Sequence, residues 1–348
     1  MTFDTLPAGP GVELSYVDSG APYYASSVYT TIVAIHGLCF TNLIFQQLLS
    51  IARQKGVRFV APNRRSYPGS TSFSPEEIDL IINGGTEEAK DAEMQSIGHQ
   101  IAIFLDNFIQ KFNIPPISKD GKSGGIIFLG WSLGCTFTLA TLANTLTLPL
   151  AVRNRLASRI RSVVLYDPAP SILGLPSPEE NWAPLVDTTI PEDLRLQAFG
   201  HWVTSYFDHG DLSKRDPALL SWIIPSVNRV PTIYSMPEAK LKEMTLFGPD
   251  ALPDLLMLIN FESQIRAAYR KACYNSTVLD AFPNVTYTVL TSNTTAAFGP
   301  SGMWAMQDDE KQFGGKRPVI YKLIPNINHF WHWADPWKAF QGFLDAAC

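Results

Sequence analysis

Short apolar runs rich in β-branched residues alternate along this chain with longer stretches in which apolar residues recur every three or four positions. The short runs predict buried strands, and the longer stretches predict helices that cover them. We expect strands at 27–35, 57–62, 125–130, 162–167, 285–292 and 318–324, with helices between them, such as 87–112, and a closing helix at 336–347. The alternation is typical of an α/β fold with a mostly parallel central sheet flanked by helices.

Residues 168–283 break this alternation, because they contain no convincing buried strand. The segment is helical in pattern, cut by prolines and dense in aromatic residues. These are Trp182, Trp202, Tyr206, Phe207, Trp222, Tyr234, Phe247, Phe261 and Tyr269. An insertion of this length is long for a connection between strands, so it predicts a subdomain. The expected organisation is a core formed by 1–167 and 284–348, interrupted by a helical cap at 168–283.

Composition narrows the classes of function. The 348 residues carry a net charge of -5 at pH 7, which provides no positive field to hold nucleic acid. The start of the chain lacks the basic and apolar pattern of a secretory signal, no stretch has the length of a membrane span, and the last residues form neither a CaaX box nor an SKL tripeptide. The four cysteines have no metal-ligand spacing. We expect a cytoplasmic protein without metal, cofactor, nucleic-acid partner or membrane span; its oligomeric state stays open.

The motif Gly130-Trp131-Ser132-Leu133-Gly134 directly follows the predicted strand 125–130 and precedes a helical run. A serine on a sharp strand-to-helix turn needs small neighbours, because chain segments pass close to it. Such a turn exposes the hydroxyl at the end of the sheet and brings the first amides of the helix near it. Ser132 is therefore the candidate nucleophile, and the amide of Leu133 is a candidate donor to an oxyanion.

A second motif, His36-Gly37-Leu38, ends the predicted strand 27–35. An acyl-transfer site needs a second oxyanion donor from the loop after such a strand, and we assign it to the amide of Leu38. We expect His36 to anchor this loop.

A serine nucleophile of this kind works in a triad with a histidine base and an acid. The base is expected near the end of the chain, where a third motif, Asn328-His329-Phe330, supplies a histidine. His329 follows the predicted strand 318–324 and is the candidate base. Its neighbour His332 better suits the start of the following helical region.

These motifs together resemble the α/β-hydrolase superfamily, with His-Gly after one strand, GWSLG after another and Asn-His-Phe before the terminal helix. The resemblance covers nearly the whole chain. Residues 61–70, APNRRSYPGS, are also similar to a family loop that usually reads PDxRGxGxS, although Asn63 replaces the acid and Ser66 the first glycine. The resemblance implies the fold, serine hydrolase chemistry and a helical cap in the place of 168–283.

The acid of the triad departs from the common family pattern. Most members carry an Asp after the strand that here is 285–292, but this chain has no carboxylate there, and Asp308 and Asp309 fall in a helical stretch well beyond it. Some members take the acid from the preceding strand, which here ends in Asp167. A carboxylate at that tip can reach the same edge of the imidazole. The resemblance therefore favours Asp167, with Asp308 or Asp309 as the alternative.

An aromatic cap would make the pocket apolar and suit a bulky hydrophobic substrate, which is the partner we expect. Phe40 and Trp131, beside the oxyanion loop and the nucleophile, are candidate substrate contacts. A cap combined with an acid after the earlier strand is loosely similar to fungal hydrolases of secondary metabolism, including acyl-CoA hydrolases and toxin-pathway enzymes.

The nucleophile type restricts the reaction, because a serine alkoxide attacks a carbonyl carbon. We expect cleavage of an ester, lactone or thioester through an acyl-enzyme. Cleavage of a carbon–carbon bond, or acyl transfer to an acceptor other than water, remains open on the same residues. Two other classes also remain open: a ligand-binding protein on this fold, and an enzyme that uses Ser132 and His329 for acid–base chemistry alone.

We predict that Ser132→Ala abolishes hydrolysis while leaving the protein folded, because the turn accepts a small side chain. Loss of a triad member typically lowers the rate by several orders of magnitude. Ester hydrolysis measures the rate, and circular dichroism controls for folding. A folded variant that keeps about a tenth of the wild-type rate would exclude Ser132 as the nucleophile.

Overall fold

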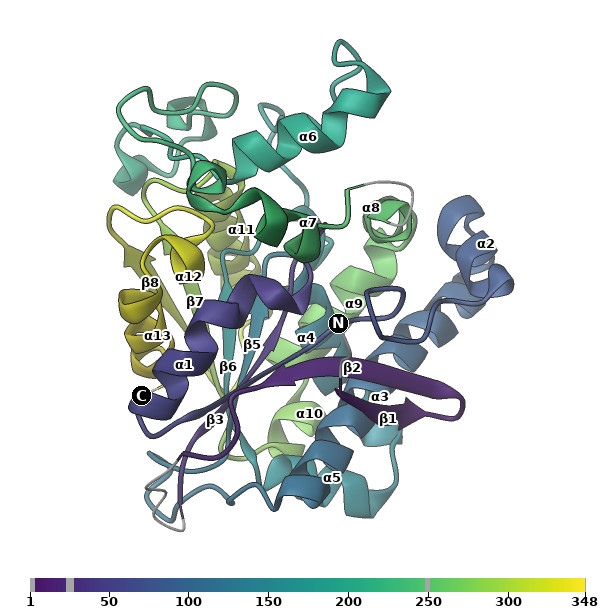
Figure 1. The fold of residues 1–348 in the computed structure, drawn as a ribbon. Coiled ribbons are helices and arrows are strands. Elements are labelled where there is room, and N and C mark those ends of the chain that lie inside the picture. Colours follow the sequence, from purple (N-terminus) through teal and green to yellow (C-terminus); the bar gives the residue numbers. More distant parts are fainter. Residues whose placement is uncertain (1–3, 23–27, 248–250, 348) are drawn as a thin grey trace.

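The computed structural model describes residues 4–22, 28–247 and 251–347. Within them, eight strands form one sheet in the order β1-β2-β4-β3-β5-β6-β7-β8. β2 is antiparallel to both β1 and β4, whereas all neighbours from β4 to β8 are parallel. Helices cover the sheet (Figure 1), so the predicted α/β architecture with a mostly parallel sheet is confirmed.

The strands are β1 (Asp4–Gly9), β2 (Val12–Asp18), β3 (Thr31–Ile35), β4 (Arg58–Pro62), β5 (Ile126–Trp131), β6 (Ile160–Tyr166), β7 (Thr286–Ser292) and β8 (Val319–Ile324). The α-helices are α1 (Gln46–Gln54), α2 (Pro75–Asn83), α3 (Glu87–Phe112), α4 (Gly134–Asn144), α5 (Leu150–Ala157), α6 (Glu192–Val203), α7 (Glu238–Met244), α8 (Leu252–Asn260), α9 (Glu262–Tyr274), α10 (Ser276–Ala281), α11 (Phe298–Phe313), α12 (Trp331–Ala334) and α13 (Pro336–Asp345).

All six predicted strands are present, with ends shifted by a few residues. The strand expected at 27–35 begins at Thr31, and residue 27 lies outside the described residues. The helix expected at 87–112 is α3, and the closing helix is α13. The hairpin β1–β2 is missing from the prediction, because its proline and glycines and its partly exposed positions do not give the apolar run of a central strand.

Strands β3 to β7 are buried on both faces, whereas the edge strand β8 is mostly exposed or half-buried. Successive side chains of a strand point to opposite sides of the sheet. Val33 and Ile35 belong to the apolar cluster that includes α3, α4 and α9, whereas Ile32 and Ala34 belong to the cluster that includes α1 and α13. Helices therefore cover both faces of the sheet, and functional side chains can be placed only at the ends of its strands.

The insertion, which we define as residues 168–285 between β6 and β7, contains no strand among its described residues. α6 and α7 lie beyond one end of the sheet, at the top of Figure 1, and α8 packs against α2. α9, in contrast, packs against α4 of the core. The domain division at residues 168 and 283 stays a prediction, but this packing argues for ending a separable cap before α9.

Hydrogen bonds fix the insertion to loops at the strand ends. Thr41 N donates to the carbonyl of Met244 at 2.8 Å, and Leu246 N donates to the carbonyl of Cys39 at 2.8 Å. The loop after β3 and the end of α7 are thus joined by backbone. No helix among the described residues is long and apolar enough to cross a bilayer.

Candidate active site

Ser132 lies on the turn between β5 and α4, with a left-handed backbone (φ 53°) that is strained for a non-glycine residue. Its flanking glycines allow other chain segments to approach. A Cβ at Gly130 would lie 2.7 Å from the Cα of Cys135, and one at Gly134 would collide with the carbonyl oxygen of Ile35. Both spacings explain why the motif requires glycine on either side of the serine.

Asp167 directly follows β6, and His329 lies in the loop after β8. The structure brings the two together: Asp167 Oδ2 lies 2.6 Å from His329 Nδ1, and each residue is only 1% exposed. Because an ionised carboxylate can only accept, the imidazole proton lies on Nδ1 and donates to Asp167. Nε2 is then the nitrogen left to accept a proton from another group.

The carboxylate of Asp167 has two further donors, which the sequence analysis missed. Thr291 Oγ1 donates to Oδ1 at 2.6 Å, and Thr295 Oγ1 donates to Oδ2 at 2.5 Å. Thr291 lies near the end of β7, and Thr295 lies just after it. The sequence shows that no carboxylate follows this strand, but it does not show that these hydroxyls donate to Asp167.

The alternative acids lie in α11 and have other partners. Asp309 forms an ion pair with Arg270 at 2.6 Å, and Asp308 forms one with Arg215 at 2.8 Å. Neither is in contact with His329, whose acidic partner is Asp167.

The loop that carries His329 is held by buried side chains. Trp131 Nε1 and Tyr166 Oη donate to the carbonyl of His329, at 3.0 and 2.9 Å. The preceding side chain, Asn328, reaches the insertion: its Nδ2 donates to the carbonyl of Thr204 and to Thr232 Oγ1, both at 2.7 Å. The position of the imidazole therefore depends on both the sheet and the insertion.

Two further histidines near the site, His332 and His36, are buried, and burial favours their neutral form. Burial lowers the pKa of His332 well below its ordinary value, and the proximity of His329 acts in the same direction. His332 packs against Trp131 with ring centroids 4.6 Å apart, and its ring nitrogens have no hydrogen-bond partner among the described residues. Burial, followed by the charge of Arg64, likewise lowers the pKa of His36, which accepts a hydrogen bond from the Arg64 amide at 3.0 Å.

The predicted oxyanion donors come from loops that meet at Ser132. Leu133 precedes α4, and Leu38 follows Gly37 in the loop after β3. A Cβ at Gly37 would lie 3.0 Å from Ser132 Cβ, so this loop passes directly over the serine.

Phe40 and Trp131, the candidate substrate contacts, are each 1% exposed and pack against each other and against Phe330. Neither lines the large cavity described next. Their contact with a substrate stays a prediction that this burial does not favour.

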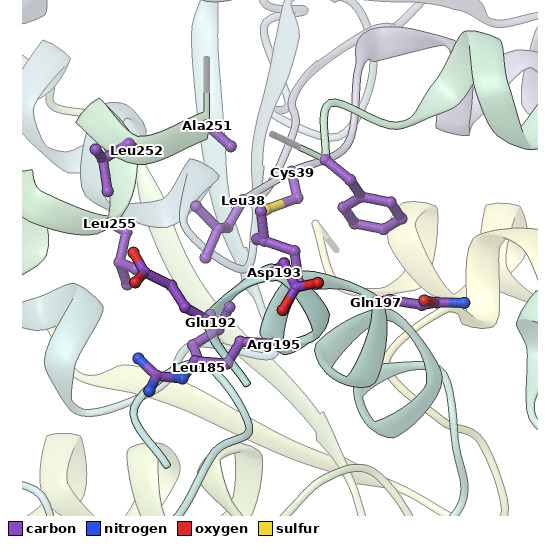
Figure 2. Close-up of a pocket in the computed structure, with 12 residues that line it drawn as sticks. Leu38, Cys39, Leu185, Glu192, Asp193, Arg195, Gln197, Ala251, Leu252 and Leu255 are labelled. Carbon is purple, nitrogen blue, oxygen red and sulfur yellow. The ribbon is translucent and has the colours of Figure 1, made fainter. Parts of the chain in front are cut away.

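A cavity of about 730 Å³ lies between the loop after β3 and the insertion (Figure 2). Leu38 and Cys39 form one part of its wall, and α6 and the segment 251–255 form others. The lining is mainly apolar, with charged groups on α6: Leu38, Cys39, Leu185, Glu192, Asp193, Arg195, Leu196, Gln197, Phe247, Ala251, Leu252 and Leu255. Ser132, Asp167 and His329 are not among these lining residues; Leu38 and Cys39 are the part of the wall that belongs to the loop over Ser132.

A comparison with protein families supports the class that this fold and site define. The model of the alpha/beta hydrolase family matches residues 32–340, and the chain therefore belongs to that family. No curated protein matches it.

Solved structures with the same fold include an esterase from Exiguobacterium antarcticum, which is 14% identical, with 100% of this chain and 99% of the esterase covered and a TM-score of 0.50. A Burkholderia cenocepacia protein provisionally described as an aryl esterase is 16% identical, with 99% and 97% covered and a TM-score of 0.53. At these identities the likeness concerns the fold.

We predict that Thr291→Val lowers the free energy of unfolding by about 1.5–3 kcal/mol, because it removes a hydroxyl donor from a buried carboxylate. Thr288→Val is the matched control: Thr288 is equally buried on β7, but donates to the neutral carbonyl of Ala346. That variant should lose only about 0.5–1.5 kcal/mol. Urea unfolding measures both, and equal losses would contradict the importance of the charge on Asp167.

Proposed function

We propose that this protein is a serine hydrolase that cleaves an ester, lactone or thioester of a bulky hydrophobic substrate through an acyl-enzyme intermediate. One observation carries the proposal: the buried 2.6 Å hydrogen bond between Asp167 and His329, at the end of the sheet where Ser132 occupies its strained turn. A histidine held by a buried carboxylate, at the same end of the sheet as a serine on a strand-to-helix turn, is the arrangement that can activate a hydroxyl for attack.

In the first half-reaction, Ser132 Oγ attacks the carbonyl carbon of the substrate while His329 Nε2 takes its proton. The imidazolium that forms is stabilised by Asp167, which stays ionised and holds the ring by Nδ1. The amides of Leu38 and Leu133 donate to the oxyanion of the tetrahedral intermediate. The carbon–oxygen or carbon–sulfur bond then breaks, and His329 returns the proton to the leaving group.

In the second half-reaction, water attacks the acyl-enzyme and gives its proton to His329. The same two amides stabilise the second oxyanion, and collapse of this intermediate releases the carboxylic acid and restores the hydroxyl of Ser132. Asp167 neither gives nor takes a proton in either step, since His329 carries out every proton transfer. This agrees with the two hydroxyl donors, Thr291 and Thr295, that satisfy its oxygens.

The size and lining of the cavity support the hydrophobic substrate. A volume of about 730 Å³ falls within the range of small-molecule sites, and its leucines and Phe247 offer apolar contact. Three charged residues of α6, namely Glu192, Asp193 and Arg195, also line the cavity.

We propose a lid that comprises the insertion up to the end of α8, because α6 and α8 line this cavity whereas α9 packs on the core.

A fluorophosphonate probe tests the proposal directly, because it phosphonylates an activated serine. We predict labelling of Ser132, located by mass spectrometry of the peptide, together with hydrolysis of p-nitrophenyl esters. Pretreatment with the probe should abolish the hydrolysis. A folded protein that neither labels nor hydrolyses these esters would favour a ligand-binding role.

Asp167→Asn is predicted to lower kcat by about 10³–10⁴ in a folded protein, because an amide favours the wrong imidazole tautomer. Asp309→Asn provides the control, since it weakens a buried carboxylate's ion pair with Arg270 away from His329. Its kcat should remain within a few-fold of the wild type. The acid assignment is wrong if the control loses the activity and Asp167→Asn retains it.

A further inference from the structure

A buried ion pair joins the loop after β4 to helix α8 of the insertion. Arg64 Nη1 and Nη2 donate to Asp254 Oδ1 and Oδ2 at 2.7 and 2.6 Å, in a two-pronged contact. The side chains are 6% and 7% exposed, and Tyr67 Oη donates to the same carboxylate at 2.7 Å. The guanidinium is also packed against rings, with its centre 4.3 Å from the centroid of Phe137. Arg64 is therefore held in one orientation.

Arg64 Nη2 also donates to Tyr67 Oη at 3.2 Å, and a further contact of this nitrogen points to a role beyond packing. The same Nη2 donates to the carbonyl oxygen of Gly37 at 3.1 Å. His36 Nδ1 lies 3.1 Å from the same oxygen. Because His36 Nε2 accepts from the Arg64 amide, the ring proton lies on Nδ1, and His36 is a second donor to Gly37.

The carbonyl of Gly37 and the N–H of Leu38 belong to one planar trans peptide, in which they point in opposite directions. Donors that fix the carbonyl therefore also fix the direction of the Leu38 N–H. Hydrogen bonds in a chain polarise one another, so a cationic donor at the oxygen makes that N–H a stronger donor. The peptide lies over Ser132, where a Cβ on Gly37 would come within 3.0 Å of Ser132 Cβ.

We propose that Arg64 and Asp254 are positioning residues that orient and polarise the Gly37–Leu38 peptide as an oxyanion donor; this inference rests on the proposed function. Asp254 lies on α8, whose residues Leu252 and Leu255 line the cavity. The helix that shapes the substrate cavity is thereby linked, through two side chains, to the group that stabilises the transition state.

The neighbouring arginine provides an internal comparison. Arg65 lies in the same loop and is equally buried, and it forms an ion pair with Glu77 at 2.8 Å. Its other hydrogen bonds are to the carbonyls of Thr71 and Ser72, away from Gly37. Its guanidinium lies over the ring of Phe73. A variant of this pair therefore perturbs the loop without removing a donor from the Gly37–Leu38 peptide.

The test replaces the polar cluster by apolar residues of similar size, as Arg64→Met/Tyr67→Phe/Asp254→Leu. Such replacements are often neutral or stabilising for the fold, whereas removal of one partner would leave a buried charge. For p-nitrophenyl ester hydrolysis we expect kcat to fall about 10- to 100-fold with KM changed by less than about threefold. The affinity for an alkyl trifluoromethyl ketone, which forms an oxyanion on Ser132, should fall by the same factor as kcat/KM. Arg65→Met/Glu77→Leu should leave both values within about threefold of the wild type.

The outcomes separate this inference from the proposed function. Unchanged kcat and ketone affinity in the triple variant, or equal losses in the Arg65/Glu77 control, would overturn the positioning role while leaving the serine hydrolase intact. Wild-type protein that does not react with the fluorophosphonate would overturn the proposed function, and this role with it. If the triple variant does not fold, Arg64→Lys decides: a single ammonium cannot make the two-pronged contact and reach Gly37 as well, so kcat and ketone affinity should fall in parallel. Unchanged values in that variant would overturn the inference.

Discussion

At Ser132 the chain turns from β5 into α4 through a left-handed residue, a conformation that costs on the order of 1 kcal/mol or more and needs support from its surroundings. Gly130 lets the end of β5 approach the start of α4, and Gly134 lets the start of α4 approach the end of β3. The loop after β3 is then drawn over the serine. The serine, the start of a helix and the loop amide thus meet at one point because of backbone geometry, before any side chain contributes.

Around this turn, the electrostatics of the site depend on groups at the ends of two neighbouring strands. β6 supplies the carboxylate of Asp167, and the end of β7 supplies hydroxyls that donate to it. A buried carboxylate is tolerated only when its oxygens are satisfied, and here three donors share them. His209 extends the arrangement outward, since its Nε2 lies 2.8 Å from the carbonyl of Thr295. The acid is therefore part of a network that reaches from the sheet into the insertion.

The sequence predicted most reliably those features that depend on local pattern. Strands buried on both faces appear in the sequence as continuous apolar runs. The motif around Ser132 is recognisable because its tight turn needs glycine at both Gly130 and Gly134. The hairpin β1–β2 is only partly buried and leaves no such run, so it was missed. Contacts between distant positions were also out of reach: Thr291 meets Asp167 across 124 positions and Arg64 meets Asp254 across 190. Phe40 and Trp131 were predicted as substrate contacts from proximity in sequence, which carries no information about how deeply either side chain is buried.

The attachment of the insertion has a consequence for how molecules enter and leave. It is joined to the loop after β3 by backbone hydrogen bonds, to the loop after β8 by Asn328, and to the loop after β4 by a buried ion pair. Lifting it as one rigid body would break all three attachments at once. Rotation of exposed side chains such as Glu192 and Gln197 at the cavity breaks none of them and occurs in picoseconds to nanoseconds. Exchange that relies on rotation of these side chains would therefore leave all three attachments of the insertion in place.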